Sequence, residues 1–214
     1  RHAGHVRGPL SGMVLAFVDV PAEWSGVHEP VVQQCLLDLI KPGDVVYDIG
    51  AHVGYYVLLA AKAMDGTGHI VAYEPEPETF RLLETTVARN DLGDMVTTRR
   101  VALAQSSGKG KIAYGTSSLY AKIEVDGGGD IELTTIDEEV GVENLPPPTV
   151  VIIDAEGLEE PIFEGGRKVL TEHRPRILAE HHLRREVLID QMATMGYTAR
   201  DIDSAHILFE PTPL

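Results

Sequence analysis

The sequence predicts a doubly wound α/β domain with a mostly parallel sheet, and three observations support this fold class. Short apolar runs of the length of buried strands alternate along the chain with longer apolar or amphipathic segments. A glycine-containing turn follows the first buried strand of this alternation and opens the next helix, as ligand-binding turns of such sheets do. The length of 214 residues suits a single domain with a substantial core.

The helices and strands of this fold can be placed by their apolar patterns. Val32, Leu36, Leu39 and Ile40 form one apolar helix face, and Pro42-Gly43 stops that helix. Buried strands are expected, in chain order, over residues 45–49, 69–73, 95–103, 149–153 and 176–181. Helices are expected over residues 54–64, 77–90, 161–171 and 184–195. Strands separated by helices indicate right-handed crossovers and therefore parallel neighbours.

The N-terminal segment is expected to lie outside this alternation. Residues 12–20 alternate weakly and predict a strand or hairpin. We therefore expect residues 1–25 to form an N-terminal extension and residues 26–214 to form the main domain. Residues 1–10 contain no apolar stretch of the kind that a signal peptide needs.

Two later segments predict antiparallel strands. Residues 109–136 indicate excursions around the loop Gly127-Gly128-Gly129, which suits a substrate lid and an ordinary exposed loop equally well. Residues 197–202 and 206–209 predict an antiparallel pair that closes the chain.

Composition restricts the class of partner. The net charge is −15, so the protein should repel a phosphate backbone, and a nucleic-acid substrate is disfavoured. No apolar run approaches the roughly 18 residues of a membrane-spanning helix, so no membrane partner is expected. Cys35 is the single cysteine, which suits a reducing cytoplasm. The composition does not indicate an oligomeric state.

The turn after the first buried strand predicts a ligand site. Asp48 precedes a turn whose glycines, Gly50 and Gly54, are spaced G-x-x-x-G. A dinucleotide fingerprint would be G-x-G-x-x-G, with the pyrophosphate at the helix N-terminus. This chain lacks the middle glycine, and a carboxylate at Asp48 suits the ammonium of a methionine moiety better than a pyrophosphate.

The next strand ends in a second acidic residue. Glu74 can accept hydrogen bonds from both ribose hydroxyls of a nucleoside, and Pro75 can pack on the adenine. The alternative for Asp48 and Glu74 is helix capping, which the pairing of the two acids makes less favoured. Together they indicate S-adenosylmethionine as the cofactor.

These motifs resemble the FkbM family of methyltransferases. The matching residues are Glu29-Pro30, residues 41–44, residues 48–56, Glu74-Pro75, Asn90, Ala102-Leu103, Gly108, residues 134–137, residues 153–159, Gly165, Arg174-Pro175 and Glu180. The block Ile-Asp-Ala-Glu-Gly-Leu-Glu over residues 153–159 is the most specific part. The sequence departs from the family at His52, where Asn is usual, at Ile152, where Lys is common, and at Pro161, where an apolar residue is usual.

The resemblance implies a Rossmann-like methyltransferase sheet and O-methylation of a hydroxyl on a small metabolite, polyketide or sugar. It implies a cofactor site formed by Asp48, Gly50, Ala51, His52, Gly54, Tyr55, Glu74, Pro75, Ala102 and Asp154. A nicotinamide-dependent oxidoreductase and a non-catalytic S-adenosylmethionine-binding module are the alternatives. The missing dinucleotide fingerprint weakens the first of them.

Four residues at or just after the ends of two strands are candidates for catalysis. Asp154 and Glu156 follow one strand, while Glu180 and His182 are expected on one face of the next strand. They can serve as bases that accept the proton of a hydroxyl. The alternatives are capping for the first pair and a strand end without chemistry for His182. A divalent metal such as magnesium is also considered but is not favoured, because the ligand spacing is not diagnostic.

Overall fold

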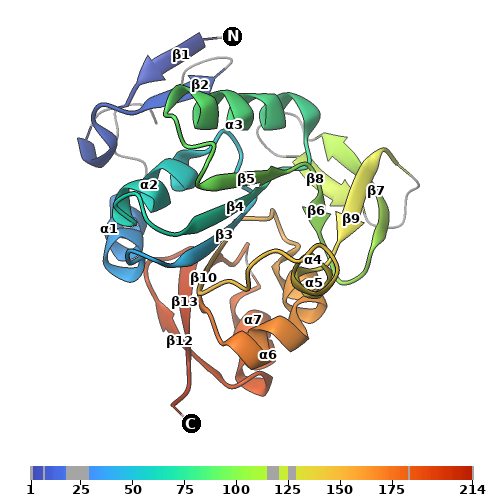
Figure 1. Cartoon of the computed structure of the whole chain (residues 1–214). Helices are drawn as coiled ribbons and strands as arrows, with labels where there is room; N and C mark the ends of the chain where they lie inside the picture. The colour runs from blue at the N-terminus through green and yellow to red at the C-terminus, as the bar shows by residue number, and fades with distance from the viewer. Residues whose placement is uncertain are drawn as a thin grey trace.

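The central sheet has the strand order β12-β13-β11-β10-β3-β4-β5 (Figure 1). The structure is a computed structural model, and it describes residues 2–6, 8–17, 29–114, 121–124, 129–182 and 184–213. Its strands are β3 (Val45–Ile49), β4 (His69–Tyr73), β5 (Val96–Arg99), β10 (Val150–Ile153), β11 (Arg176–Glu180), β12 (Tyr197–Asp201) and β13 (His206–Pro211). Strand β13 runs antiparallel to both β11 and β12, and the other neighbours are parallel. The predicted fold class is therefore confirmed, including the antiparallel pair.

The sheet has a switch point between β3 and β10. From β3 the chain builds outward through β4 to β5, and it then returns to place β10 on the other side of β3. Ligands of doubly wound sheets bind beyond the carboxyl ends of the strands at such a point. The loops after β3 and β10 are thereby brought side by side.

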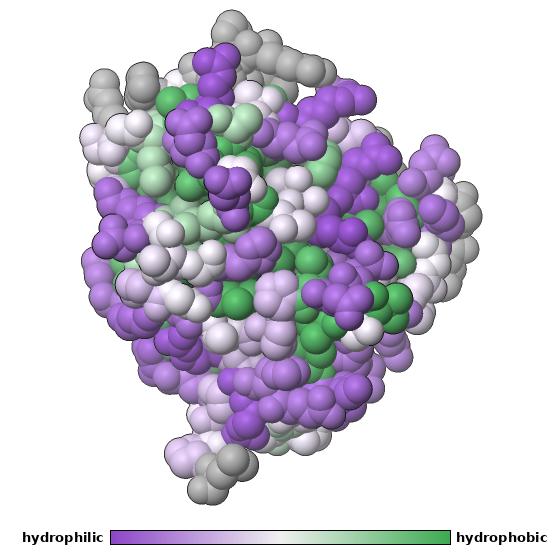
Figure 2. Space-filling view, viewed as in Figure 1, coloured by the Kyte–Doolittle hydropathy of each residue, from purple (hydrophilic) through white to green (hydrophobic). Residues whose placement is uncertain are grey.

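Helices cover both faces of the sheet. Along β3, Val46 packs into one apolar cluster and Tyr47 into the other, because side chains alternate between the two faces of a strand. The first face is covered by α1 (Pro30–Leu39), α2 (Tyr55–Ala63) and α3 (Pro77–Arg89). The second face is covered by α4 (Ile136–Gly141), α5 (Glu159–Gly165), α6 (Arg167–His173) and α7 (Arg185–Thr194). Figure 2 shows hydrophilic side chains over most of one side of the molecule, with hydrophobic ones between them near its centre.

A small second sheet corrects one predicted strand. The expected strand over residues 95–103 is wrong, because the chain leaves the main sheet after β5 and then forms β6 (Ala102–Leu103). Arg99, the last residue of β5, forms a two-pronged ion pair with Glu139 of α4, which is fully buried. The small sheet has the order β6-β9-β7-β8. Its other strands are β7 (Gly108–Tyr114), β8 (Ala121–Glu124) and β9 (Ile131–Thr134).

The antiparallel strands predicted over residues 109–136 are present as β7 with β8 and β7 with β9. Residues 115–120 and 125–128 lie outside the described residues, so the lid hypothesis stays a prediction. The short helix α4, which starts at Ile136, was not expected.

The helix predicted over residues 161–171 is in fact two helices, α5 and α6, that meet at Gly166. A Cβ atom at Gly165 would lie 2.1 Å from the carbonyl oxygen of Ala104, so the end of α5 approaches the backbone after β6 very closely. The break thus lies beside a close contact that requires glycine and that the continuing apolar pattern does not reveal.

The N-terminal hairpin packs on the main domain. It pairs β1 (His2–His5) with β2 (Val14–Phe17), and the 3₁₀ helix η1 (Gly8–Leu10) lies between them. The backbone N–H of Ala16 donates to the hydroxyl of Thr86 on α3 at 3.0 Å. The boundary predicted at residue 25 lies outside the described residues and stays a prediction. None of the described helices combines the length and the apolar character of a membrane span.

Candidate functional site

The loop after β3 is held against the ends of two neighbouring strands. The backbone N–H groups of Gly50 and Ala51 donate to the carbonyl of Tyr73, the last residue of β4, at 3.1 and 2.9 Å. Gly50 has a positive φ of 86°, and a Cβ atom there would lie 1.9 Å from the carbonyl oxygen of Asp154. Only glycine allows this contact, which brings the loop against the segment after β10.

His52 adopts a left-handed backbone conformation in this loop, with a φ of 47°. Asn, Asp and His are the side chains that tolerate this region best, which explains why His52 replaces an Asn without changing the turn. Its N–H donates to Glu74 Oε2 at 3.0 Å. Gly54, with a φ of 96°, forms the N-cap of α2.

Glu74 fixes the loops on both sides of itself. It is buried, and its Oε1 accepts from the N–H of Glu76 at 2.9 Å, while its Oε2 accepts from His52. Burial raises its pKa to about 7 although these backbone hydrogen bonds oppose the shift. Each carboxylate oxygen keeps a second lone pair that can accept from a ligand hydroxyl. The capping alternative does not hold for Glu74, because Glu76 caps α3 by accepting from the N–H of Thr79 at 2.6 Å.

Asp48 is a buried carboxylate with an unsatisfied oxygen. Its side chain is 1% exposed, and Oδ2 has no hydrogen-bond partner among the described residues. Burial, and then the charges of Asp154 and Glu74, raise its pKa to about 8. A buried carboxylate without a partner is costly unless a ligand supplies one. The ammonium and sulfonium of S-adenosylmethionine are cations that suit this position, so the residues present fit the cofactor.

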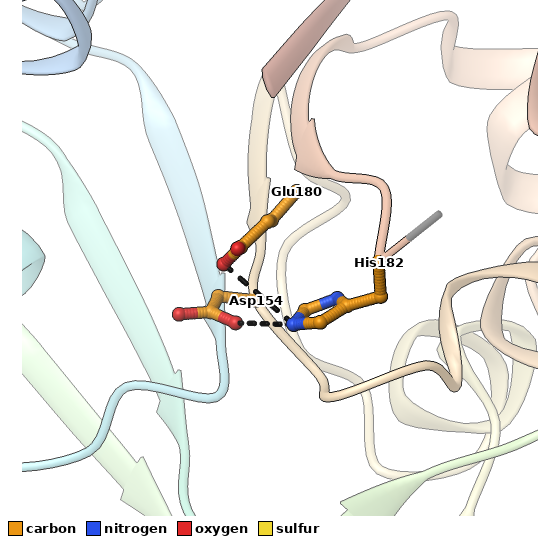
Figure 3. A group of neighbouring side chains, drawn as sticks. All are labelled: Asp154, Glu180 and His182. Atoms are coloured by element: carbon orange, nitrogen blue, oxygen red, sulfur yellow. Dashed lines mark ion pairs between the residues drawn. The ribbon is translucent and has the colours of Figure 1, made fainter. Parts of the chain in front are cut away.

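The four predicted catalytic residues converge on one place. His182 Nε2 lies 3.8 Å from Asp154 Oδ1, 3.4 Å from Glu156 Oε2 and 3.8 Å from Glu180 Oε2. Figure 3 shows Asp154, Glu180 and His182 pointing toward one another. Asp154 is also tied to the cofactor loop, because its N–H donates to the carbonyl of Ile49 at 3.0 Å. Neither Asp154 nor Glu156 caps α5, whose first turn has no side-chain cap.

The backbone position of His182 differs from the prediction. Strand β11 ends at Glu180, so period-two alternation does not place His182. His182 instead lies in a left-handed turn with a φ of 37°. Glu156 on the opposite loop is also left-handed, with a φ of 49°. Strained backbone of this kind gathers at ligand sites, where the surrounding structure holds it in place.

Glu159 is a site residue that the sequence reasoning did not single out. It is 0% exposed, and its Oε1 lies 3.0 Å from His182 Nδ1 and accepts from the N–H of Gly157. This hydrogen bond to Glu159 is the main reason that the pKa of His182 rises to about 9. This pKa favours the imidazolium form of His182 at neutral pH, so the carboxylates beside it are the better candidates for the proton acceptor. Glu159 belongs to the acidic block at residues 153–159, and this block is the feature of the sequence from which its role in the site could have been predicted.

The remaining predicted cofactor residues lie in different surroundings. Pro75 directly follows Glu74 and is half-buried. The hydroxyl of Tyr55 accepts from Gln33 of α1, so it is engaged within the protein. Ala102 is buried in β6, where it pairs with Leu133 of the small sheet. Its role in cofactor binding stays a prediction.

A second polar group joins α1 and α2 to the C-terminal strands. The hydroxyl of Tyr56 donates to Glu29, whose Oε2 lies 3.7 Å from His206 Nε2. His206 is 5% exposed, and its Nδ1 lies 2.9 Å from Asp203 Oδ1.

The family of the chain is decided by comparison with known proteins. Residues 48–202 match the family described as the methyltransferase FkbM domain. The chain belongs to this family. The matched segment contains Asp48, Glu74, Asp154 and His182, and the match confirms S-adenosylmethionine as the cofactor to which the motifs point.

One relative and two solved structures are similar to this FkbM-domain chain. It is 30% identical over 142 residues to the hexuronic acid methyltransferase AglP of Haloferax volcanii, covering 64% of this chain and 56% of that protein. Its structure is similar to methyltransferase FkbM of Methylobacillus flagellatus, with a TM-score of 0.60 and 17% identity over 79% of this chain and 44% of that one. It is also similar to the tRNA methyltransferase TrmK of Bacillus subtilis, with a TM-score of 0.52 and 16% identity over 85% of this chain and 65% of that one. At these identities the two structures show the fold alone, and the chain spans about half the length of AglP and of FkbM.

Proposed function

We propose that this FkbM-domain protein transfers a methyl group from S-adenosylmethionine to a hydroxyl of a small polar acceptor. The observation that carries the proposal is the unsatisfied carboxylate of Asp48 beneath the Gly50 turn, beside the converging acids Asp154 and Glu156. When bound, S-adenosylmethionine supplies an electrophilic methyl group. The protein's part is to hold that methyl in line with the acceptor oxygen and to take up the hydroxyl proton.

The site residues divide this work by position. Asp48 faces the cationic end of the cofactor, and Glu74 accepts from its ribose hydroxyls. Asp154 and Glu156 lie on the acceptor side, where one of the two removes the proton. As the carbon–sulfur bond breaks, a carbon–oxygen bond forms to the acceptor, and S-adenosylhomocysteine is released with its sulfur neutral.

A sugar is the acceptor class that we favour among sugars, polyketides and other small metabolites. Support comes from AglP, the relative named for hexuronic acid. A nucleic-acid acceptor is disfavoured by the net charge of −15, although a tRNA methyltransferase shares the fold. A cytoplasmic location stays a prediction.

The two alternatives make different predictions. A nicotinamide-dependent enzyme would need a pyrophosphate at the N-terminus of α2, where the charges of Asp48 and Glu74 oppose it. A binding module without catalysis would retain cofactor affinity in the absence of methyl transfer to any acceptor. Incubation with labelled S-adenosylmethionine and a panel of hydroxylated sugars, read by mass spectrometry, separates the second alternative from the proposal.

The Asp154–Glu156 pair is expected to serve the chemical step more than cofactor affinity. Glu156→Gln should keep the wild-type affinity for S-adenosylhomocysteine and lose about 10²–10⁴-fold in kcat, the usual cost of removing a base. Asp154→Asn should lose a similar factor and some cofactor affinity as well, because Asp154 touches the Gly50 turn.

Matched controls are Glu172→Gln on α6 and Asp190→Asn on α7, two exposed acids outside the site. They should turn over at the wild-type rate. Wild-type kcat in both Glu156→Gln and Asp154→Asn would show that the pair is structural.

A further inference from the structure

We propose that Asp154, Glu180 and His182 form a binding site for one divalent cation, of the class represented by Mn²⁺. One ligand atom from each residue can be chosen so that all three lie within 4.8 Å of one another. The three side chains come from the loop after β10, the end of β11 and the turn that follows it, and they face a common point (Figure 3). This inference rests on the proposed function for its role in catalysis, but the cation can be measured without cofactor or acceptor.

The spacing of these atoms is that of ion pairs without direct hydrogen bonds, and it also allows the three groups to share one ion. His182 Nε2 lies 3.8 Å from both Asp154 Oδ1 and Glu180 Oε2, beyond the usual range of N–H···O bonds. An octahedral ion about 2.1 Å from each ligand separates neighbouring ligand atoms by about 3.0 Å and opposite ones by about 4.2 Å. Neither measured separation exceeds the larger value, so one ion can reach His182 together with either carboxylate.

His182 is held in the orientation that a metal ligand needs. Glu159 is wholly buried, lies outside the ligand group and accepts a hydrogen bond from His182 Nδ1 at 3.0 Å. A buried carboxylate in this position fixes the ring and directs the other nitrogen toward the ion. A cation would take the place of the proton on Nε2.

Asp154 gives an independent reason for a bound ligand. The Asp154 side chain as a whole is 41% exposed and pairs with His182, but its Oδ1, the atom nearest His182 Nε2, is shielded from solvent and has no hydrogen-bond partner in the described part of the chain. Buried carboxylate oxygens are nearly always satisfied by a donor or an ion. Two carboxylates with one imidazole suit Mn²⁺, since imidazole disfavours Ca²⁺.

The cation would bind the acceptor and activate its hydroxyl group. Two carboxylates and one nitrogen leave positions open for oxygen atoms of the acceptor, which neighbouring hydroxyls or a carboxylate of a sugar can fill. Binding an acceptor hydroxyl to the ion lowers its pKa. Its proton then passes to Glu156, which lies beside the three ligands with its Oε2 3.4 Å from His182 Nε2, as the methyl carbon leaves sulfur and bonds to the oxygen.

Titration with MnCl₂ tests the site directly. The full chain is mixed with Mn²⁺ in about 0.15 M KCl, where surface attraction to the acidic protein is screened, and free Mn²⁺ is followed by electron paramagnetic resonance. We expect one bound ion per chain, and at least about 10-fold weaker binding in Glu180→Gln and His182→Gln. Glu159→Gln should weaken Mn²⁺ binding by about 10–100-fold, because the carboxylate that orients the His182 ring is then missing.

Two matched substitutions outside the site are the controls. Glu164→Gln lies on the same helix as Glu159, and His173→Gln is an exposed histidine at the end of α6. Both should bind Mn²⁺ as the wild type does. Glu180 and His182 are partly exposed, so their variants should fold even if Glu159→Gln does not. Absence of stoichiometric binding, or binding that is equal in Glu180→Gln, His182→Gln and the controls, would overturn the proposal. Because no cofactor is present, neither outcome depends on methyl transfer.

Discussion

At the scale of single residues, the site combines two buried carboxylates, Asp48 and Glu74, that form no ion pair with a basic side chain in the described part of the chain. Burial raises the pKa of Asp48 to about 8 and that of Glu74 to about 7. The folded protein therefore holds these protons more tightly than the unfolded chain does. The stabilisation from both groups is complete below about pH 4 and is lost as the pH rises through their folded pKa values.

This linkage predicts opposite pH dependences for stability and cofactor affinity. The free energy of unfolding of the free protein should fall between about pH 5 and about pH 8.5, and Asp48→Asn should reduce that fall by at least about 1 kcal/mol. Affinity for S-adenosylmethionine should rise over the same range, because only ionised carboxylates attract its cationic end. Denaturant unfolding of the two proteins at both pH values checks the first part. An equal fall in wild type and Asp48→Asn would show that Asp48 is not buried as a neutral acid.

Glu74→Ala should weaken binding of S-adenosylhomocysteine by about 2–3 kcal/mol, the scale of charged hydrogen bonds to ribose. Calorimetry measures this loss, with Glu78→Ala as the control, since Glu78 is exposed in the first turn of α3 and pairs with Arg81. An unchanged dissociation constant in folded Glu74→Ala would remove Glu74 from the cofactor site.

Some of these residues could be predicted from sequence, and others could not. Asp48, Gly50 and Glu74 follow apolar runs directly, and the ends of parallel strands are where ligands bind. The role of Glu159 depends on its complete burial beneath His182, which no local pattern encodes. The sequence shows Glu159 only as one member of the acidic motif at residues 153–159, without indicating its contact with His182.

At the scale of elements, the contact between the Gly50 turn and Asp154 joins the cofactor side to the acceptor side. Gly50→Ala would place a Cβ atom 1.9 Å from the carbonyl oxygen of Asp154, so the loop after β3 must separate from the segment after β10. We expect a loss of at least about 100-fold in cofactor affinity, equal to about 2.7 kcal/mol.

Gly66→Ala is the matched control for this substitution. Gly66 also has a positive φ, of 78°, but a Cβ atom there would meet nothing within 4 Å. It should cost only the about 1–2 kcal/mol of left-handed strain and leave cofactor affinity unchanged. Cofactor affinity in Gly50→Ala that matches Gly66→Ala would mean that the turn does not contact the cofactor.

Element boundaries were predicted well where apolar runs end at a turn and poorly where packing decides. Strands β3 and β4 match their predicted residues. Where the chain leaves the sheet after β5, Arg99 pairs with buried Glu139, a contact between residues 40 positions apart that no local pattern reveals. The break between α5 and α6 likewise lies beside a contact between distant residues, the approach of Gly165 to Ala104.

At the scale of the whole molecule, the fold class was readable because the buried strands are apolar on both faces. Strands with two apolar faces must be covered by helices on both sides, and the alternation along the chain supplies those helices. The same topology places the loops after β3 and β10 at the switch point, so residues from positions 48 to 182 meet in one site. The fold does not identify the methyl acceptor, because proteins that share one fold act on many different substrates.

The central claim is that this site binds S-adenosylmethionine and not a dinucleotide. Isothermal titration calorimetry of the full chain with S-adenosylhomocysteine, and separately with NAD⁺, tests it most directly. We predict a single site for S-adenosylhomocysteine with a dissociation constant on the order of micromolar, lost in Gly50→Ala, and no heat from NAD⁺. Binding of NAD⁺ together with no binding of S-adenosylhomocysteine at about 1 mM, a free energy of about −4 kcal/mol, would contradict the account.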